Sequence, residues 1–251
     1  SSRVEIIRRH GARVEVTERN YDETVRLVWE LADKNGWQVI QDTAWEGYTE
    51  IPRWIMQGYT TMSVEAVGQM AAAGRRPTHV LVQAGVGAFA AAMVAHLANV
   101  FFDKPPRFIV LEPNRAACML ASSQAGDGRP RGVAGDLNTI MAGLACGEPS
   151  ILAWDIVREW SCCFIGCDDF VAANGMRILA NPIGDDVRVE AGESGAVGIG
   201  LLDRLANHPG CEALRKELGI GPKAIVLAFN TEGATDPVNY RDVVWYGKYC
   251  G

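Results

Sequence analysis

Apolar positions along the chain fall into two patterns, compact runs and stretches with helical spacing. Residues 21–34 carry apolar side chains at helical spacing and end before an Asn-Gly pair, which predicts a helix. Residues 79–83, with apolar side chains at 80–82, and the apolar run 108–111 predict compact buried strands. The small-residue stretch 88–100 between them predicts a second helix. Strand, helix and strand in this order indicate a parallel βαβ unit.

The rest of the chain extends this alternation. We expect further helices over 51–73, 116–122, 137–145 and 152–158 and a short strand over 37–40. Candidate strands or loops of the same layer are 165–167, 187–191 and 224–229. The pattern predicts an α/β fold in which residues 76–251 form a large domain with a doubly wound, mostly parallel sheet. Residues 1–75 would be the remainder of a smaller α/β domain.

Composition and charge narrow the class of partner. With 48% hydrophobic and 22% charged residues, the chain is typical of a globular protein and not of a disordered one. A net charge of -6 provides no basic excess for nucleic-acid phosphates or an anionic membrane, so we expect neither partner. The apolar stretch 82–100 is interrupted by Gln83, His96 and Asn99 and is too polar for a membrane span.

The cysteines argue against a metal site. Their number is odd, and they lack the paired C-x-x-C spacing of zinc proteins: Cys118, Cys146, Cys162, Cys163, Cys167, Cys211 and Cys250. We therefore expect no metal. Reduced, mostly buried thiols are typical of a cytoplasmic protein, and we expect this location.

The segment 83–88, Gln-Ala-Gly-Val-Gly-Ala, connects the predicted strand to the predicted helix through two glycines. Backbone N–H groups and the helix dipole at such a turn can bind an anion, most naturally a phosphate. The same letters satisfy a relaxed G-x-G-x-x-A dinucleotide pattern, in which Glu112 at the end of the next strand would bind a ribose. A glycine turn that binds nothing is the third interpretation.

Four longer segments favour the phosphate interpretation. They are QDTAWEGY at 41–48, IMAGLACGEP at 140–149, GESGA at 192–196 and NTEGATD at 230–236. In this order they resemble the diaminopropionate ammonia-lyase family, a branch of the fold type II enzymes that use pyridoxal 5'-phosphate (PLP). The resemblance runs from near Val4 to near Lys248 and implies the fold type II, tryptophan synthase β-like architecture.

The resemblance implies positions for the cofactor. Gly85, Val86, Gly87 and Ala88 would bind the PLP phosphate through backbone N–H groups. Thr231, with Asn230 as second choice, would lie opposite the pyridine nitrogen. A neutral partner there leaves the ring nitrogen largely unprotonated, which suits β-elimination. The alternative for Thr231 is a hydroxyl that only satisfies a turn.

Further site residues also follow from the resemblance. Asp42 would be an active-site acid that binds the second ammonium of 2,3-diaminopropionate or assists proton transfer, unless it only caps a loop. Glu193 would lie close to the cofactor ring, unless it is a helix-start carboxylate stabilised by the dipole. Trp45 and Tyr48 are candidates for the pocket wall, although packing alone would explain them.

The Schiff-base lysine is the main departure from the family pattern. In the family it lies upstream of these motifs, together with an Asp-Gly-Asn-His-Gly stretch, and neither has a counterpart here. Residues 4–16 already resemble the middle of a helix-loop-strand unit, so we expect the chain to be N-terminally incomplete. None of the five lysines is assigned the linking role: Lys34, Lys104, Lys216, Lys223 and Lys248.

The resemblance implies α,β-elimination of 2,3-diaminopropionate to pyruvate and ammonia by a homodimeric lyase. Cys118 and Cys146 could approach each other near the pocket, with free thiols favoured. Two other classes of function stay open. One is a nicotinamide oxidoreductase that uses Gly85, Gly87 and Glu112, and the other is a non-catalytic fragment that only binds a partner.

Overall fold

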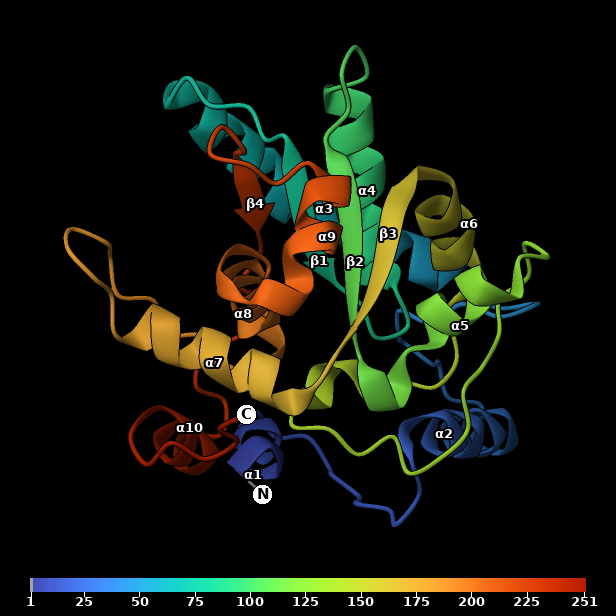
Figure 1. The fold of residues 1–251 in the computed structure, drawn as a ribbon. Coiled ribbons are helices and arrows are strands. Elements are labelled where there is room, and N and C mark those ends of the chain that lie inside the picture. The colour runs from blue at the N-terminus through green and yellow to red at the C-terminus, as the bar shows by residue number, and fades with distance from the viewer. Residues whose placement is uncertain (1) are drawn as a thin grey trace.

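The computed structural model describes residues 2–251 and is built around one four-stranded parallel sheet (Figure 1). The strand order is β3-β2-β1-β4, and every neighbouring pair is parallel. The strands are β1 (His79–Gln83), β2 (Arg107–Pro113), β3 (Ser161–Cys167) and β4 (Val226–Ala228). The predicted α/β class and the βαβ unit from β1 to β2 are confirmed.

Helices cover both faces of the sheet. One layer consists of α4 (Ala88–Val100), with α3 (Glu50–Ala72) and α6 (Ile151–Trp160) packed against it. The other consists of α8 (Glu193–Asn207), α7 (Asp169–Ala180) and α9 (Glu212–Leu218). The remaining helices are α1 (Ser2–Arg9), α2 (Tyr21–Asn35), α5 (Cys118–Ala125) and α10 (Pro237–Val244), with 3-10 turns at Asn114–Ala116, Ala142–Leu144 and Pro209–Cys211.

Successive residues of the central strands face opposite layers. Val80 and Val82 of β1 belong to the core cluster that contains α4 and α6 residues. Leu81, between them, belongs to the cluster that contains Val197 and Leu201 of α8. A parallel sheet that is buried on both faces favours apolar residues at successive positions, which explains the apolar runs within β1 and β2.

Several predicted elements differ from the structure. Residues 137–145 form only a short 3-10 turn, because Thr139 Oγ1 and the Ile140 N–H bind the Asp169 carboxylate instead of a helical carbonyl. Residues 37–40 and 187–191 are loops. In the segment 37–40, the Val39 carbonyl accepts a hydrogen bond from the Tyr48 hydroxyl instead of from a neighbouring strand. Helices α7, α8, α9 and α10 were not predicted.

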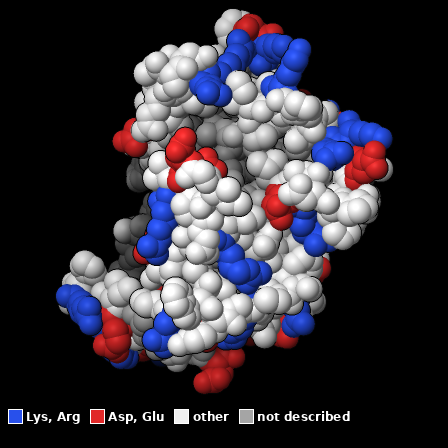
Figure 2. Space-filling model, turned by 60° about the vertical axis from the view of Figure 1, so that its left-hand side comes forward, with Lys and Arg blue, Asp and Glu red and all other residues white. Residues whose placement is uncertain are grey.

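All four strands lie within residues 79–228. Residues 2–75 contribute α1, α2, α3 and an isolated bridge between Trp45 and Tyr48. The domain boundary near residue 75 stays a prediction. Within residues 2–251, no helix combines the length and the apolar character that a bilayer span requires. Basic and acidic side chains are interspersed on the face shown in Figure 2.

The contact between α7 and α8 depends on two glycines. A Cβ atom added at Gly200 would overlap the Val171 carbonyl oxygen, and one added at Gly175 would overlap the Ala196 carbonyl oxygen. Because both clashes are with helix backbone, side-chain rotation cannot relieve them. The two helices can therefore approach this closely only with glycine at both positions.

We predict that Gly175→Ala destabilises the protein by about 3 kcal/mol and lowers the melting temperature by roughly 6–12 °C. Gly68→Ala is the matched control, because an added Cβ at Gly68 of α3 meets nothing within 4 Å. It should stabilise the helix by about 0.5–1 kcal/mol. Calorimetry on both variants checks the prediction, and equal melting temperatures would contradict it.

Candidate functional site

A cavity of about 640 Å³ lies at the carboxyl ends of β1 and β4. This volume is in the range of small-molecule and cofactor sites. Segments that are distant in the sequence line it: the glycine turn 83–90, residues of α3, the 143–146 loop, Ser194 and Thr231. Ligands of open α/β sheets bind at this edge, outside the carboxyl ends of the strands.

The glycine turn forms one wall of the cavity and leads into α4. Gly87 is the residue before the helix and has a φ of +91°, which favours glycine. A Cβ at Gly87 would overlap Met119, and one at Gly85 would lie 3.1 Å from Cys146 Sγ and 3.2 Å from the Gly143 carbonyl oxygen. The first N–H groups of α4 have no partner within the helix, so they are available to a phosphate.

Ser150 connects the glycine turn to the QDTAWEGY segment at 41–48. It is fully buried, and its N–H donates to the Val86 carbonyl at 2.8 Å. Its hydroxyl accepts the Ala44 N–H at 3.0 Å, and the Ile151 N–H donates back to the Ala44 carbonyl at 3.2 Å. These bonds hold Asp42 on the same cavity as the glycine turn.

The Asp42 carboxylate accepts a hydrogen bond from the Tyr59 hydroxyl at 3.0 Å. Tyr59 lies on α3, lines the cavity and was not singled out from the sequence. Burial, followed by the charge of Asp42, raises the pKa of Tyr59 to about 12, so the phenol stays a donor. Only the helical spacing of α3 hinted that one of its faces would be buried.

Trp45 and Tyr48 do not line this cavity. Their rings stack with centroids 4.5 Å apart, and the Trp29 ring contacts Trp45 edge-on at 5.2 Å. The Tyr48 hydroxyl donates to the Val39 carbonyl at 3.1 Å. The packing interpretation of these two aromatic residues therefore describes them better.

Thr231 lines the cavity, whereas Asn230 does not. The Thr231 hydroxyl accepts a hydrogen bond from the buried Gln83 amide at 2.9 Å. The Asn230 amide instead donates to the Glu190 carbonyl at 3.0 Å. Of the two candidates for the ring-nitrogen position, the structure brings only Thr231 to the cavity.

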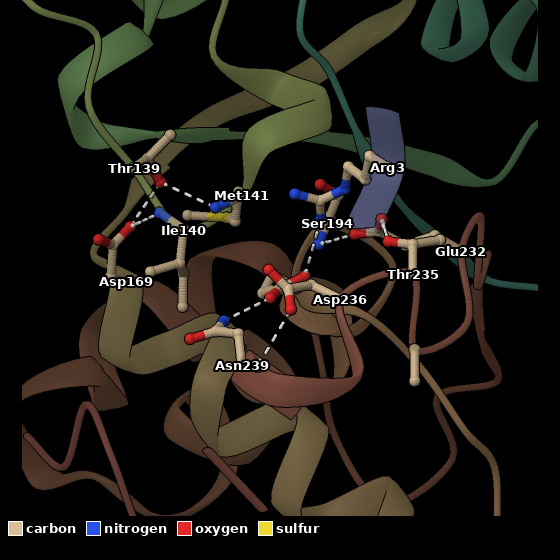
Figure 3. A network of polar contacts seen from close by, with 12 residues as sticks. Arg3, Thr139, Ile140, Met141, Asp169, Ser194, Glu232, Thr235, Asp236 and Asn239 are labelled. Atoms are coloured by element: carbon tan, nitrogen blue, oxygen red, sulfur yellow. Dashed lines mark hydrogen bonds and ion pairs between the residues drawn. The ribbon is translucent and has the colours of Figure 1, made fainter. Parts of the chain in front are cut away.

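The GESGA turn directs Ser194 to the cavity and Glu193 away from it. The Glu193 carboxylate is buried and binds Asn239 Nδ2 at 2.5 Å and the Arg3 guanidinium at 3.6 Å, on a separate polar cavity. Ser194 lies in the first turn of α8, and its N–H donates to the Glu232 carboxylate at 2.7 Å. Figure 3 shows this hydrogen bond. In the described chain, the buried Ser194 hydroxyl has no hydrogen-bond partner.

Glu112 is not available to a ribose. Its side chain is fully buried, and its two oxygens accept the N–H groups of Met119 and Leu120 at 2.7 and 2.8 Å. Burial outweighs these hydrogen bonds and raises the pKa of Glu112 to about 7. The nicotinamide oxidoreductase interpretation of Gly85, Gly87 and Glu112 is not supported, because this carboxylate stabilises the start of α5 instead.

Cys118 and Cys146 lie on either side of Gly85 as free thiols. The Cys118 thiol faces the Gly85 carbonyl at 3.7 Å. Burial raises the pKa of both thiols, that of Cys146 to about 12. Both therefore stay neutral near pH 7 and add no negative charge beside a bound phosphate.

Comparison with known proteins identifies the class. Residues 1–215 match the family model described as pyridoxal-phosphate dependent enzyme, and the chain belongs to that family. PLP is the cofactor that defines this class. The predicted fold type II architecture and the predicted cofactor agree with this result.

Within the family, the chain is similar to diaminopropionate ammonia-lyases. It is 51% identical to the one from Escherichia coli (strain K12) over 248 residues, which are 99% of this chain and 62% of the relative. The corresponding values for Salmonella typhimurium (strain LT2) are 48% identity, 98% and 61%. The chain thus spans slightly less than two thirds of the length of these relatives.

A solved structure gives the same result. The crystal structure of the E. coli diaminopropionate ammonia-lyase, in complex with an aminoacrylate-PLP azomethine reaction intermediate, superposes with a TM-score of 0.91. The match has 49% identity and covers 99% of this chain and 63% of that one. These comparisons also give no support to a fragment that only binds a partner.

We predict that Glu112 makes stability depend on pH. Its pKa of about 7 lies above the usual 4.5, so the folded state holds a proton that the unfolded state releases in this window. The stabilisation is complete below about pH 4.5 and is lost as the pH rises to about 7. Relative to Glu112→Gln, the free energy of unfolding should fall by about 3 kcal/mol across this window.

Urea unfolding of wild type and Glu112→Gln at a series of pH values checks this prediction. Glu159→Gln is the control, because Glu159 is an exposed carboxyl on α6. Its difference from wild type is the baseline with which the Glu112→Gln difference is compared at each pH. A Glu112→Gln difference that does not change with pH would contradict the raised pKa of Glu112.

Proposed function

We propose that this chain holds the phosphate and ring-nitrogen sites of a PLP-dependent lyase that converts 2,3-diaminopropionate and water to pyruvate and two molecules of ammonia. The observation that carries the proposal is the single cavity shared by the glycine turn, Thr231 and Asp42. The 51% identity to a diaminopropionate ammonia-lyase over nearly the whole chain supports the substrate.

The residues present fit PLP at both ends. At the phosphate end, Gly85 and Gly87 have no side chains, and the N-terminus of α4 provides free N–H groups. A Cβ at Gly85 would be crowded by Cys146 and Gly143, and one at Gly87 would overlap Met119. At the ring end, the Thr231 hydroxyl faces the cavity with a proton to donate. The unpartnered Ser194 hydroxyl in the described cavity lining is a further group for a polar ligand.

Bound PLP supplies stabilisation of the negative charge that develops when the substrate loses its Cα proton. The backbone of residues 85–88 would hold and orient the phosphate, and Thr231 would hold the ring nitrogen. Asp42 is close enough to the cavity to bind the second ammonium of the substrate or to carry a proton, and Tyr59 fixes the orientation of its carboxylate.

No lysine of this chain is proposed to link PLP. Among residues 2–251, no lysine lines the cavity. We therefore assign the linking lysine to the part of the relatives' length that this chain does not match. Lys34, Lys104, Lys216, Lys223 and Lys248 are not part of the proposed chemistry.

The cellular setting is part of the same proposal. All seven cysteines, which lie in the described chain, are free thiols, as expected in a reducing compartment such as the cytoplasm. A homodimer is expected from the family resemblance and stays a prediction.

We predict that Gly87→Ala weakens PLP binding by about tenfold or more, because a residue with a Cβ is strained at a φ of +91° and the new methyl group would overlap Met119. Gly58→Ala is the matched control: Gly58 lines the same cavity, but its added Cβ meets nothing within 4 Å. Titration of PLP by tryptophan fluorescence measures both affinities. Equal weakening in the two variants would contradict the phosphate site.

Residues 1–251 alone should bind PLP without sustained turnover of 2,3-diaminopropionate, because the linking lysine is missing from the cavity. Intact mass after borohydride treatment and a pyruvate assay test this. Sustained pyruvate, or PLP attached to one of the five lysines, would show that the lysine assignment is wrong. A chain that binds no PLP would overturn the proposed function.

A further inference from the structure

Gln83 is a buried polar residue at the end of β1, after three apolar residues. It is the last residue of β1 and only 3% exposed. The side-chain Nε2 donates to the Phe229 carbonyl at 2.9 Å and to Thr231 Oγ1 at 2.9 Å. Both acceptors follow β4, which pairs with β1 in the sheet. One amide therefore connects the strand before the glycine turn with the predicted ring-nitrogen residue.

The orientation of this amide has only one consistent solution. A carbonyl oxygen such as that of Phe229 can only accept, so the NH₂ group of Gln83 must face it. A flipped amide would place two carbonyl oxygens against each other. The same NH₂ group then donates to Thr231, and the Thr231 oxygen is an acceptor in this bond.

The polarity of this bond determines what Thr231 can offer a ligand. An NH₂ group cannot accept, so the single hydroxyl proton of Thr231 cannot point toward Gln83. Thr231 lines the cavity, and its proton is available there to a ligand acceptor. An unprotonated pyridine nitrogen can accept this proton, whereas a pyridinium N–H would compete with the Gln83 NH₂ group for the lone pairs of the same Thr231 oxygen.

We propose that Gln83 is a positioning residue that orients the Thr231 hydroxyl to donate to the ring nitrogen of bound PLP and thereby favours the unprotonated state of that nitrogen. This inference rests on the proposed function. It assigns control of the protonation state of the cofactor ring to a strand residue that acts through the Thr231 hydroxyl. An unprotonated ring withdraws electrons less strongly, which suits elimination.

Other groups on the cavity also affect the protonation of the ring nitrogen. Its titratable residues are Tyr21, Asp42, Tyr59, Glu65, Cys146 and Glu232. A carboxylate near the ring would favour the protonated nitrogen. Glu232 is next to Thr231 in the chain, but its two oxygens bind the Ser194 N–H at 2.7 Å and the Thr235 hydroxyl at 3.3 Å. The Gln83 hydrogen bond must outweigh these charges.

The test uses pyridoxine 5'-phosphate labelled with ¹⁵N in the ring, because this compound has no aldehyde and needs no lysine. The ¹⁵N chemical shift of the bound ligand at pH 7 reports its protonation. We expect an unprotonated nitrogen in the wild-type chain. In Gln83→Met the hydroxyl is free to rotate and accept, so the shift should move toward the protonated value.

Two further variants make the comparison specific. Gln38→Met is the matched control, because the exposed Gln38 amide also donates to a backbone carbonyl, that of Val39 at 3.1 Å, but lies off the cavity. It should bind the ligand with the wild-type shift. In a Thr231→Val background, Gln83→Met should cause no additional change, because the effect passes through the Thr231 hydroxyl.

A second measurement needs only the wild-type chain. An analogue with CH in place of the ring nitrogen should bind about fivefold to tenfold more weakly, the loss expected for one hydrogen bond. A protonated nitrogen in the wild type, or equal affinity for both ligands, would overturn the Gln83 inference while leaving the phosphate site intact. No binding of either ligand would instead overturn the proposed function.

Discussion

The hydrogen bonds of one buried serine hold together the segments that form the cavity. Ser150 starts α6, donates its N–H to the glycine turn and accepts the N–H of Ala44 through its hydroxyl. A buried polar group without such partners would destabilise the fold, so all three segments must be in place together. Gly147, three residues earlier, adds α2 to the same assembly by donating to Asp22 at 2.8 Å.

This assembly explains why the cavity is narrow around Gly85. The 143–146 loop approaches the turn so closely that its backbone and the Cys146 thiol occupy the space of a side chain. Because both neighbouring thiols stay neutral, they add no negative charge beside an anion that binds the N–H groups at this point. Glycine in the turn and a serine behind it are thus two parts of one arrangement for binding a phosphate.

Polar residues at the ends of adjacent strands have different uses. Gln83 ends β1 and orients a hydroxyl of the cavity, whereas Glu112, near the end of β2, is buried and binds the backbone of α5. In the sequence both follow an apolar run, and only Glu112 was a candidate for binding a ligand. Only the direction of each side chain separates them, and that direction depends on which layer of helices covers the strand end.

The sequence by itself determined the βαβ unit, the glycine turn and the family, because these depend on local periodicity, on the need for glycine at a positive φ and on long shared segments. Tertiary structure decided which side chains reach the cavity. At the start of α8, neighbouring residues point about 100° apart, so Ser194 faces the cavity and Glu193 faces Asn239. Tyr59 and Gln83 gained their roles only through contacts with Asp42 and Thr231, 17 and 148 residues away along the chain. No pattern within a short window contains such contacts, because they arise from the packing of helices and strands around one edge of the sheet.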